Sequence, residues 1–197
     1  SPATSPANQA TPAHQASNRR LEQEKILVEM IIRYGEQVVF CTEDENGNCV
    51  PLTVIEFIML SMREEGLTFS DPRHLQIMDD ALAQVKQEGF NAMHYFVNHP
   101  QLAVSQLAAT LCMDQIPLSK YHGNETGLGN LDETIPRLIY NIKLEMAKDE
   151  LLRLTTQLSH LPKDCSQEEK NALLNNYLEA KKLVQELAFK CDQRVFS

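Results

Sequence analysis

The chain has 197 residues, of which 43% are hydrophobic, and a formal net charge of −9. This composition is sufficient for a buried core, and no unbroken apolar run is long enough to predict a membrane-spanning helix. Residues 21–130 contain six Lys or Arg against sixteen Asp or Glu. Because binding to a nucleic-acid backbone depends on basic residues that displace counterions, we expect no direct nucleic-acid binding.

The five cysteines occur at irregular spacings and follow no recognisable signal peptide. Such usage is typical of reduced thiols in a cytoplasmic protein, and we expect neither a disulfide framework nor a membrane location. The chain begins at Ser1 without a methionine, which suggests a fragment of a longer protein.

Residues 1–18 are rich in Ser, Pro, Ala, Gln and Thr and contain no large apolar side chain. Such a segment cannot offset the entropy cost of ordering, so we predict a disordered linker. Residues 21–34 then carry polar side chains at every fourth position, at Lys25, Glu29 and Arg33. The remaining residues form a wide apolar face, which predicts a largely buried helix that ends at Gly35.

The segment 37–52 contains two short β-prone runs on either side of Asn46-Gly47, a pair favoured in tight hairpin turns. We therefore expect one small exposed β-hairpin near residues 38–51. Thr53 and Glu56 form a capping-box pattern that opens a helix, and Asp71-Pro72 is a helix-start signal. Leu75, Met78, Leu82 and Val85 repeat at helical spacing after Pro72.

Two shorter helices are expected near 92–98 and 101–111, because His99-Pro100 interrupts the helical pattern. Residues 113–130 contain Pro117 and three glycines and are predicted to form a connecting loop. Together these segments predict a compact helical bundle over residues 19–130.

The last third of the chain, residues 131–197, predicts a long antiparallel helical hairpin. Two series of residues are spaced alternately by three and four, and each forms an apolar seam that requires one facing helix. The series are Leu144, Ala147, Leu151, Leu154, Leu158 and Leu161, and Leu173, Tyr177, Ala180, Val184, Leu187 and Cys191. Pro162 ends the first helix, and a Ser166/Glu169 capping box starts the second. The fold class is therefore all-α, a bundle followed by a hairpin.

Several apolar residues of the hairpin lie off this seam: Leu152, Leu174, Leu178, Leu183 and Phe189. They either complete the packing within the molecule or form a docking face, since exposed apolar patches commonly mark partner sites.

The sequence contains no convincing catalytic, metal or cofactor site. His94 and His99 are five residues apart and do not share a helix face, and Cys41 and Cys49 lack the partners of a zinc site. The acidic stretch around Gly47 lacks the first and last ligands of a calcium loop. If the chain were nevertheless an enzyme, His94, Cys112 and Asp114 would be the best candidates.

Four segments, taken in order, resemble the C-terminal, helicase-binding domain of bacterial DnaG-type DNA primases. They are EKILVEMIIRYG (24–35), TVIEFIMLSMREEGLTFSDP (53–72), FVNHPQLAVSQLAATL (96–111) and LDETIPRLIYNIK (131–143). The resemblance implies a non-catalytic domain that docks on the amino-terminal domain of the replicative DnaB-type helicase. It also implies that the primer-synthesising core, a DNA-directed RNA polymerase, lies outside these residues.

The residues that we expect to contact the helicase lie near the two ends of the hairpin: Leu158, Leu161, Leu174, Leu178, Phe189, Arg194, Val195 and Phe196. A different interpretation is a helical adaptor or scaffold that binds an unrelated protein, because helical hairpins commonly serve as peptide docks. Self-association through leftover apolar surface is a further possibility.

Overall fold

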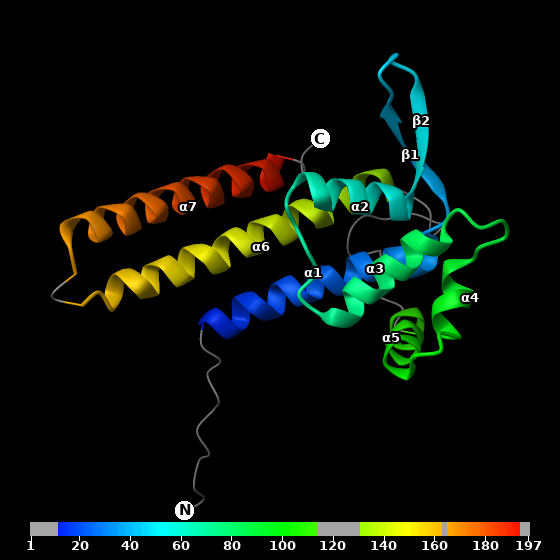
Figure 1. The fold of residues 1–197 in the computed structure, drawn as a ribbon, viewed down its shortest axis with the longest axis horizontal. Coiled ribbons are helices and arrows are strands. Elements are labelled where there is room, and N and C mark those ends of the chain that lie inside the picture. Colours follow the sequence, from blue (N-terminus) through cyan, green and yellow to red (C-terminus); the bar gives the residue numbers. More distant parts are fainter. Residues whose placement is uncertain (1–11, 114–130, 163–164, 194–197) are drawn as a thin grey trace, which may run out of the picture. The chain divides into compact units, whose positions relative to one another are not determined.

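The structure is a computed structural model that describes residues 12–113, 131–162 and 165–193 (Figure 1). Its described part is all-helical apart from one two-stranded antiparallel sheet, as the sequence predicts. The elements in order are α1 Pro12–Tyr34, β1 Val38–Glu43, β2 Cys49–Thr53, α2 Val54–Glu64, α3 Pro72–Gln84, α4 Ala92–Val97, α5 Leu102–Met113, α6 Leu131–Ser159 and α7 Gln167–Gln193. The expected loop over 113–130 lies almost entirely outside the described residues.

The chain divides into two compact units, one of Leu21–Lys143 and one of Ser1–Arg20 with Leu144–Ser197. The boundaries between these units fall inside α1 and α6, whereas the sequence predicted a boundary at residues 130 and 131, before the hairpin. Among the described residues, no helix is both long enough and apolar enough to cross a bilayer.

Helix α1 begins earlier than expected. Residues 12–18, assigned to the linker from their composition, lie in α1, and residues 1–11 are outside the described part. Pro12 occupies the first helical position, where its missing N–H costs nothing, and the alanines and glutamine that follow are acceptable helix formers. The linker prediction relied on the absence of large apolar side chains, which does not prevent a helix from extending beyond its buried part.

The core of the Leu21–Lys143 unit is built from apolar faces of α1, α2, α3, α4, α5 and the first part of α6. Fully buried side chains from these helices include Leu27, Ile31, Ile32, Ile55, Ile58, Ile77, Phe96, Ile135 and Ile142. Thr53 caps α2 through the predicted box, in which its Oγ1 accepts from the Glu56 N–H at 3.2 Å. Asp71 caps α3 by accepting from the Arg73 N–H at 2.8 Å.

The buried face of α3 coincides only in part with the apolar series that follows Pro72. The buried residues are His74, Ile77, Met78 and Ala81, while Leu75 is 39% exposed and Leu82 and Val85 are half-buried. On this buried face, Nδ1 of His74 lies 3.3 Å from the buried Glu24 carboxylate. The apolar spacing predicted the helix, and the burial of His74 depends on this polar contact with α1.

The predicted hairpin is confirmed, with strands β1 and β2 paired antiparallel around the Asn46-Gly47 turn. Gly47 has φ of 78°, a conformation that glycine adopts without steric cost. Cys41 and Cys49 are joined by a disulfide, so the expectation of reduced thiols is wrong for these two residues. Strand pairing brings their Cα atoms to 5.7 Å, within the range that a disulfide requires.

Candidate protein-docking surface

The unit that contains α7 is organised by the predicted seam between α6 and α7. In α6 the seam residues Leu144, Ala147 and Leu154 are buried, and in α7 Leu187 is buried. The other predicted seam residues, Leu151, Leu158, Leu161, Leu173, Tyr177, Ala180, Val184 and Cys191, are half-buried. The two helices lie antiparallel, side by side (Figure 1), and the predicted hairpin is confirmed.

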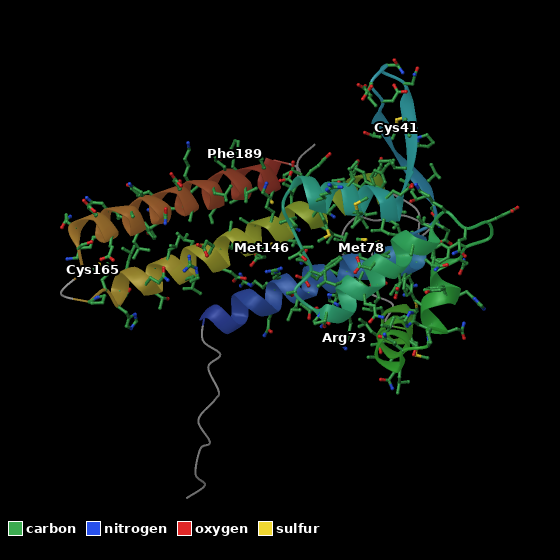
Figure 2. All side chains as sticks on the ribbon, viewed as in Figure 1. Cys41, Arg73, Met78, Met146, Cys165 and Phe189 are labelled. Atoms are coloured by element: carbon green, nitrogen blue, oxygen red, sulfur yellow. A yellow bond between two sulfur atoms is a disulfide. The ribbon has the colours of Figure 1, made fainter. Side chains whose placement is uncertain are left out.

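A capping box fixes the start of α7, as the sequence predicts. The Ser166 N–H donates to Oε2 of Glu169 at 3.0 Å, and the Glu169 N–H donates to Oγ of Ser166 at 3.2 Å. The hydrogen bond from the Ser166 backbone, first among several, lowers the pKa of the Glu169 carboxyl. The thiol of Cys165, labelled at the turn in Figure 2, also lies 3.4 Å from this carboxylate. The turn therefore gives α7 a defined first residue and direction.

Charged groups of α6 in this unit interact with one another and with α1. Burial raises the pKa of the Asp149 carboxyl, and the positive charge of Arg20 on α1 opposes this shift. Glu150 accepts from Nη2 of Arg153 at 2.6 Å, which lowers the pKa of that carboxyl. Polar contacts thus accompany the apolar seam along α6.

The outward side of α7 carries large apolar side chains that the described residues leave uncovered. Leu174, Leu178 and Phe189 are 47%, 53% and 62% exposed. At about 100° per residue, Leu178 and Phe189 lie about 40° and about 60° from Leu174 around the helix. They are about 120° and about 140° from the seam residue Val184, and Figure 2 shows Phe189 on the side of α7 away from α6.

Three polar residues complete this face between Leu178 and Phe189, namely Lys181, Lys182 and Gln185. All three are exposed, and Lys182 makes only a long ion pair of 3.8 Å with Glu186. We call the set Leu174, Leu178, Lys181, Lys182, Gln185 and Phe189 the outer stripe. It contains no acidic side chain, a property that the spacing of the apolar residues alone does not reveal, because it depends on their polar neighbours around the helix.

The residues predicted to contact a partner fall into three groups. Leu174, Leu178 and Phe189 lie together on the outer stripe. Leu158 and Leu161 are half-buried in the seam. Arg194, Val195 and Phe196 are outside the described residues. Of the other off-seam residues, Leu152 is half-buried, and Leu183 is 42% exposed but lies about 140° from Leu178 around α7.

Of the three residues considered as enzymatic candidates, two lie in the described part of the chain, and they are on different helices. His94 is exposed on α4, Cys112 is half-buried on α5, and Asp114 is outside the described part. Burial raises the pKa of the Cys112 thiol, which disfavours the nucleophilic thiolate. Within the described ranges, no group of three or more His, Cys, Asp or Glu side chains is arranged to hold a metal ion.

The described part of the chain is a mostly helical protein with one small β-hairpin and a C-terminal helical hairpin. The chain belongs to the family described as Domain of unknown function (DUF8430), whose model matches residues 11–195. No curated protein and no solved structure matches the chain.

Proposed function

We propose that this chain is a non-catalytic protein-docking domain that binds its partner through the outer stripe of α7. The observation that carries the proposal is the alignment of Leu174, Leu178 and Phe189, each at least 47% exposed, on one side of a long helix. Exposed apolar side chains cost free energy in water, and burying them against a partner recovers about 25 cal/mol per Å² before the costs of association. An amphipathic helix face of this kind is a common recognition mode.

The hairpin presents this stripe in a preorganised form. The seam residues Leu154 and Leu187 are only 2% and 3% exposed, and the Ser166/Glu169 box fixes the first turn of α7. A partner would therefore bind a helix that is already ordered. Preorganisation favours affinity because less conformational entropy is lost on binding.

Charge favours a different protein over a second copy of this chain. In a twofold antiparallel pairing of the stripes, Leu174 would meet Phe189 of the other copy, and Lys181 and Lys182 lie midway between them. The four lysines would then converge at the symmetry axis, and like charges placed together oppose association. The stripe better fits an apolar surface flanked by acidic groups.

The resemblance of four segments to the helicase-binding domain of DnaG-type primases suggests the identity of this partner, the amino-terminal domain of a DnaB-type helicase. Docking would hold a tethered primer-synthesising core near the single strand that leaves the helicase. Tethering raises the effective concentration of that core without adding a catalytic group in this chain. The chemistry of primer synthesis would then reside in the remainder of the parent protein.

The test compares two leucines of the same helix. Leu178→Glu places a charge at the centre of the outer stripe, and Leu183→Glu places the same charge about 140° away, on an exposed position outside it. Binding to a DnaB-type helicase is measured by isothermal calorimetry, with helicity checked by circular dichroism. We expect Leu178→Glu to weaken binding by about 30-fold or more, typical of a central contact, and Leu183→Glu to weaken it by less than about threefold.

Two outcomes would contradict the proposal. Equal losses in both variants would show that the outer stripe is not the contact surface. Undiminished helicase binding after deletion of residues 133–197 would exclude the hairpin altogether. A third outcome would favour the adaptor interpretation over helicase docking. In that case the wild-type chain binds no helicase but binds another protein, and Leu178→Glu abolishes this binding.

A further inference from the structure

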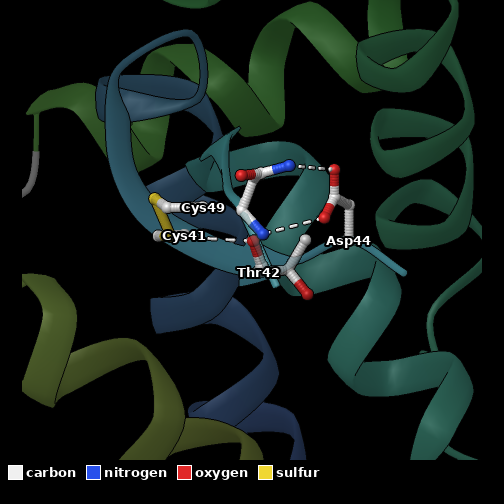
Figure 3. The surroundings of a disulfide bond; sticks show 5 residues. Cys41, Thr42, Asp44 and Cys49 are labelled. Atoms are coloured by element: carbon white, nitrogen blue, oxygen red, sulfur yellow. Dashed lines mark hydrogen bonds between the residues drawn. A yellow bond between two sulfur atoms is a disulfide. The ribbon is translucent and has the colours of Figure 1, made fainter. Parts of the chain in front are cut away.

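The Cys41–Cys49 disulfide lies on one face of the β-hairpin. Cys41 pairs with Pro51 and Glu43 pairs with Cys49, so the two cysteines are diagonal neighbours on adjacent strands. Because side chains alternate along a strand, both cysteines, Glu43 and Pro51 share the same face. Figure 3 shows the disulfide beside the turn that Asp44 organises.

That face is exposed to solvent, and the opposite face anchors the hairpin. Cys41, Glu43, Cys49 and Pro51 are all exposed, whereas Phe40, Thr42 and Leu52 are half-buried. The Phe40 ring stacks on Phe57 of α2, with centroids 3.7 Å apart. The disulfide therefore lies on the exposed face, and the contact that holds the hairpin to α2 is made by residues of the opposite face.

The other cysteines are less accessible. Cys112, Cys165 and Cys191 are half-buried, and burial raises the pKa of the Cys112 thiol. Exposure and thiolate character govern how fast a sulfur takes part in thiol–disulfide exchange. A small thiol reagent should therefore act first at the hairpin.

We propose that Cys41 and Cys49 form a reversible thiol–disulfide exchange site that controls the order of the hairpin turn. In reduction, a thiolate of a dithiol reagent attacks one cysteine sulfur and forms a mixed disulfide, and the other cysteine leaves as a thiolate. The second thiol of the reagent then displaces the first cysteine, so two electrons and two protons pass to the protein and the reagent becomes a cyclic disulfide. Re-formation of the bond is the reverse exchange with a disulfide reagent.

The reduced hairpin keeps some local contacts. The Asp44 carboxylate accepts from the backbone N–H groups of Asn46 and Asn48, each at 2.8 Å. The Cys41 sulfur lies 3.6 Å from the Thr42 carbonyl oxygen, a contact that becomes a weak hydrogen bond once the sulfur carries a proton. A two-stranded hairpin is marginal by itself, so loss of the cross-link loosens the turn while Phe40 still holds the base.

The experiment equilibrates the chain in buffers of dithiothreitol and its cyclic disulfide, quenches with acid, and labels free thiols with N-ethylmaleimide for peptide mass spectrometry. Cys41 and Cys49 should lose and regain the label together in one two-electron transition. Amide hydrogen exchange is then measured on the oxidised and the reduced wild-type chain, on the Cys49→Ser variant, and on a Cys112→Ser control. Residues 41–50 should exchange about tenfold faster without the bond, and residues 54–64 should be unchanged.

The proposal fails if Cys41 and Cys49 stay labelled in the oxidising buffer, if reduction requires a denaturant, or if either cysteine pairs with a third. It also fails if hairpin exchange is identical in both redox states. A change in hairpin exchange in Cys112→Ser matching that in Cys49→Ser would equally overturn it, because the effect would then not depend on this disulfide. None of these outcomes bears on helicase docking, which rests on α7.

Discussion

A buried carboxylate on α1 contacts residues at the start of α3, and its removal is a direct test of how these two helices pack. Glu24 is 0% exposed. Its Oε2 accepts from the Ser70 N–H and from Oγ of Ser70, both at 2.9 Å, and lies 3.3 Å from Nδ1 of His74. Glu24→Gln keeps the shape but replaces one accepting oxygen with an NH₂ group that faces these donors.

The expected cost follows from these contacts. Hydrogen bonds to a charged group contribute about 1.5–3 kcal/mol each, and a buried donor left without a partner costs about 1–3 kcal/mol. Since the amide retains one oxygen, we expect Glu24→Gln to lower the free energy of unfolding by about 3 kcal/mol. For a chain of this length, that loss corresponds to a decrease in Tm of about 6–12 °C.

The matched control is Glu22→Gln, the same chemical change two residues away on α1. Glu22 is exposed and makes an ion pair of 2.8 Å with Lys25, which is worth less than about 1 kcal/mol. Urea unfolding, followed by circular dichroism at 222 nm, measures both variants. Equal midpoints for Glu24→Gln and Glu22→Gln, with unchanged m values, would refute the assigned role of Glu24.

Three further predictions concern other parts of the chain. Leu154→Ala, at a seam position 2% exposed, should cost about 2–4 kcal/mol, measured by hydrogen exchange in α6 and α7; unchanged protection would contradict the seam. Gly35→Ala should cost at least about 2 kcal/mol in urea unfolding, because a Cβ there would clash with the backbone carbonyl oxygen of Ile31 and lie 2.6 Å from Cδ1 of Ile55; a neutral result would show that both the backbone at the end of α1 and Ile55 can move aside. The hydrogen bond from Arg73 lowers the pKa of Asp71 to about 2, below its ordinary value of 3.8, so its stabilisation is present above about pH 4 and is lost as pH falls toward 2. Asp71→Asn should therefore lower stability by about 1 kcal/mol or less at pH 6, after solvent screening, and by a clearly smaller amount at pH 2, where about half of the carboxyls are protonated; an equal difference at pH 6 and pH 2 would contradict the titration.

Local signals were reliable wherever one short pattern specifies one element. The three-four spacing predicted the helical hairpin, and its residues are all buried or half-buried, while the pairs Thr53/Glu56 and Ser166/Glu169 predicted two helix starts. Asn46-Gly47 predicted the hairpin turn. These patterns succeed because the interacting groups lie within a few residues of one another, so the sequence itself determines their geometry.

Features that depend on distant residues were decided only by the tertiary structure. Glu29 was expected on a polar face, but it is buried, where Nε of Arg33 donates to it at 2.7 Å while Nη2 of Arg33 binds the Leu111 carbonyl oxygen. In the same way, His74 of α3 is buried next to the Glu24 carboxylate of α1, and strand pairing brought Cys41 to Cys49. The sequence by itself determined the helices, the turn and the seam through short-range spacing. Long-range packing decided which polar groups are buried, which cysteines form the disulfide and which leucines stay exposed. Each of these features requires partners that only the folded chain brings together.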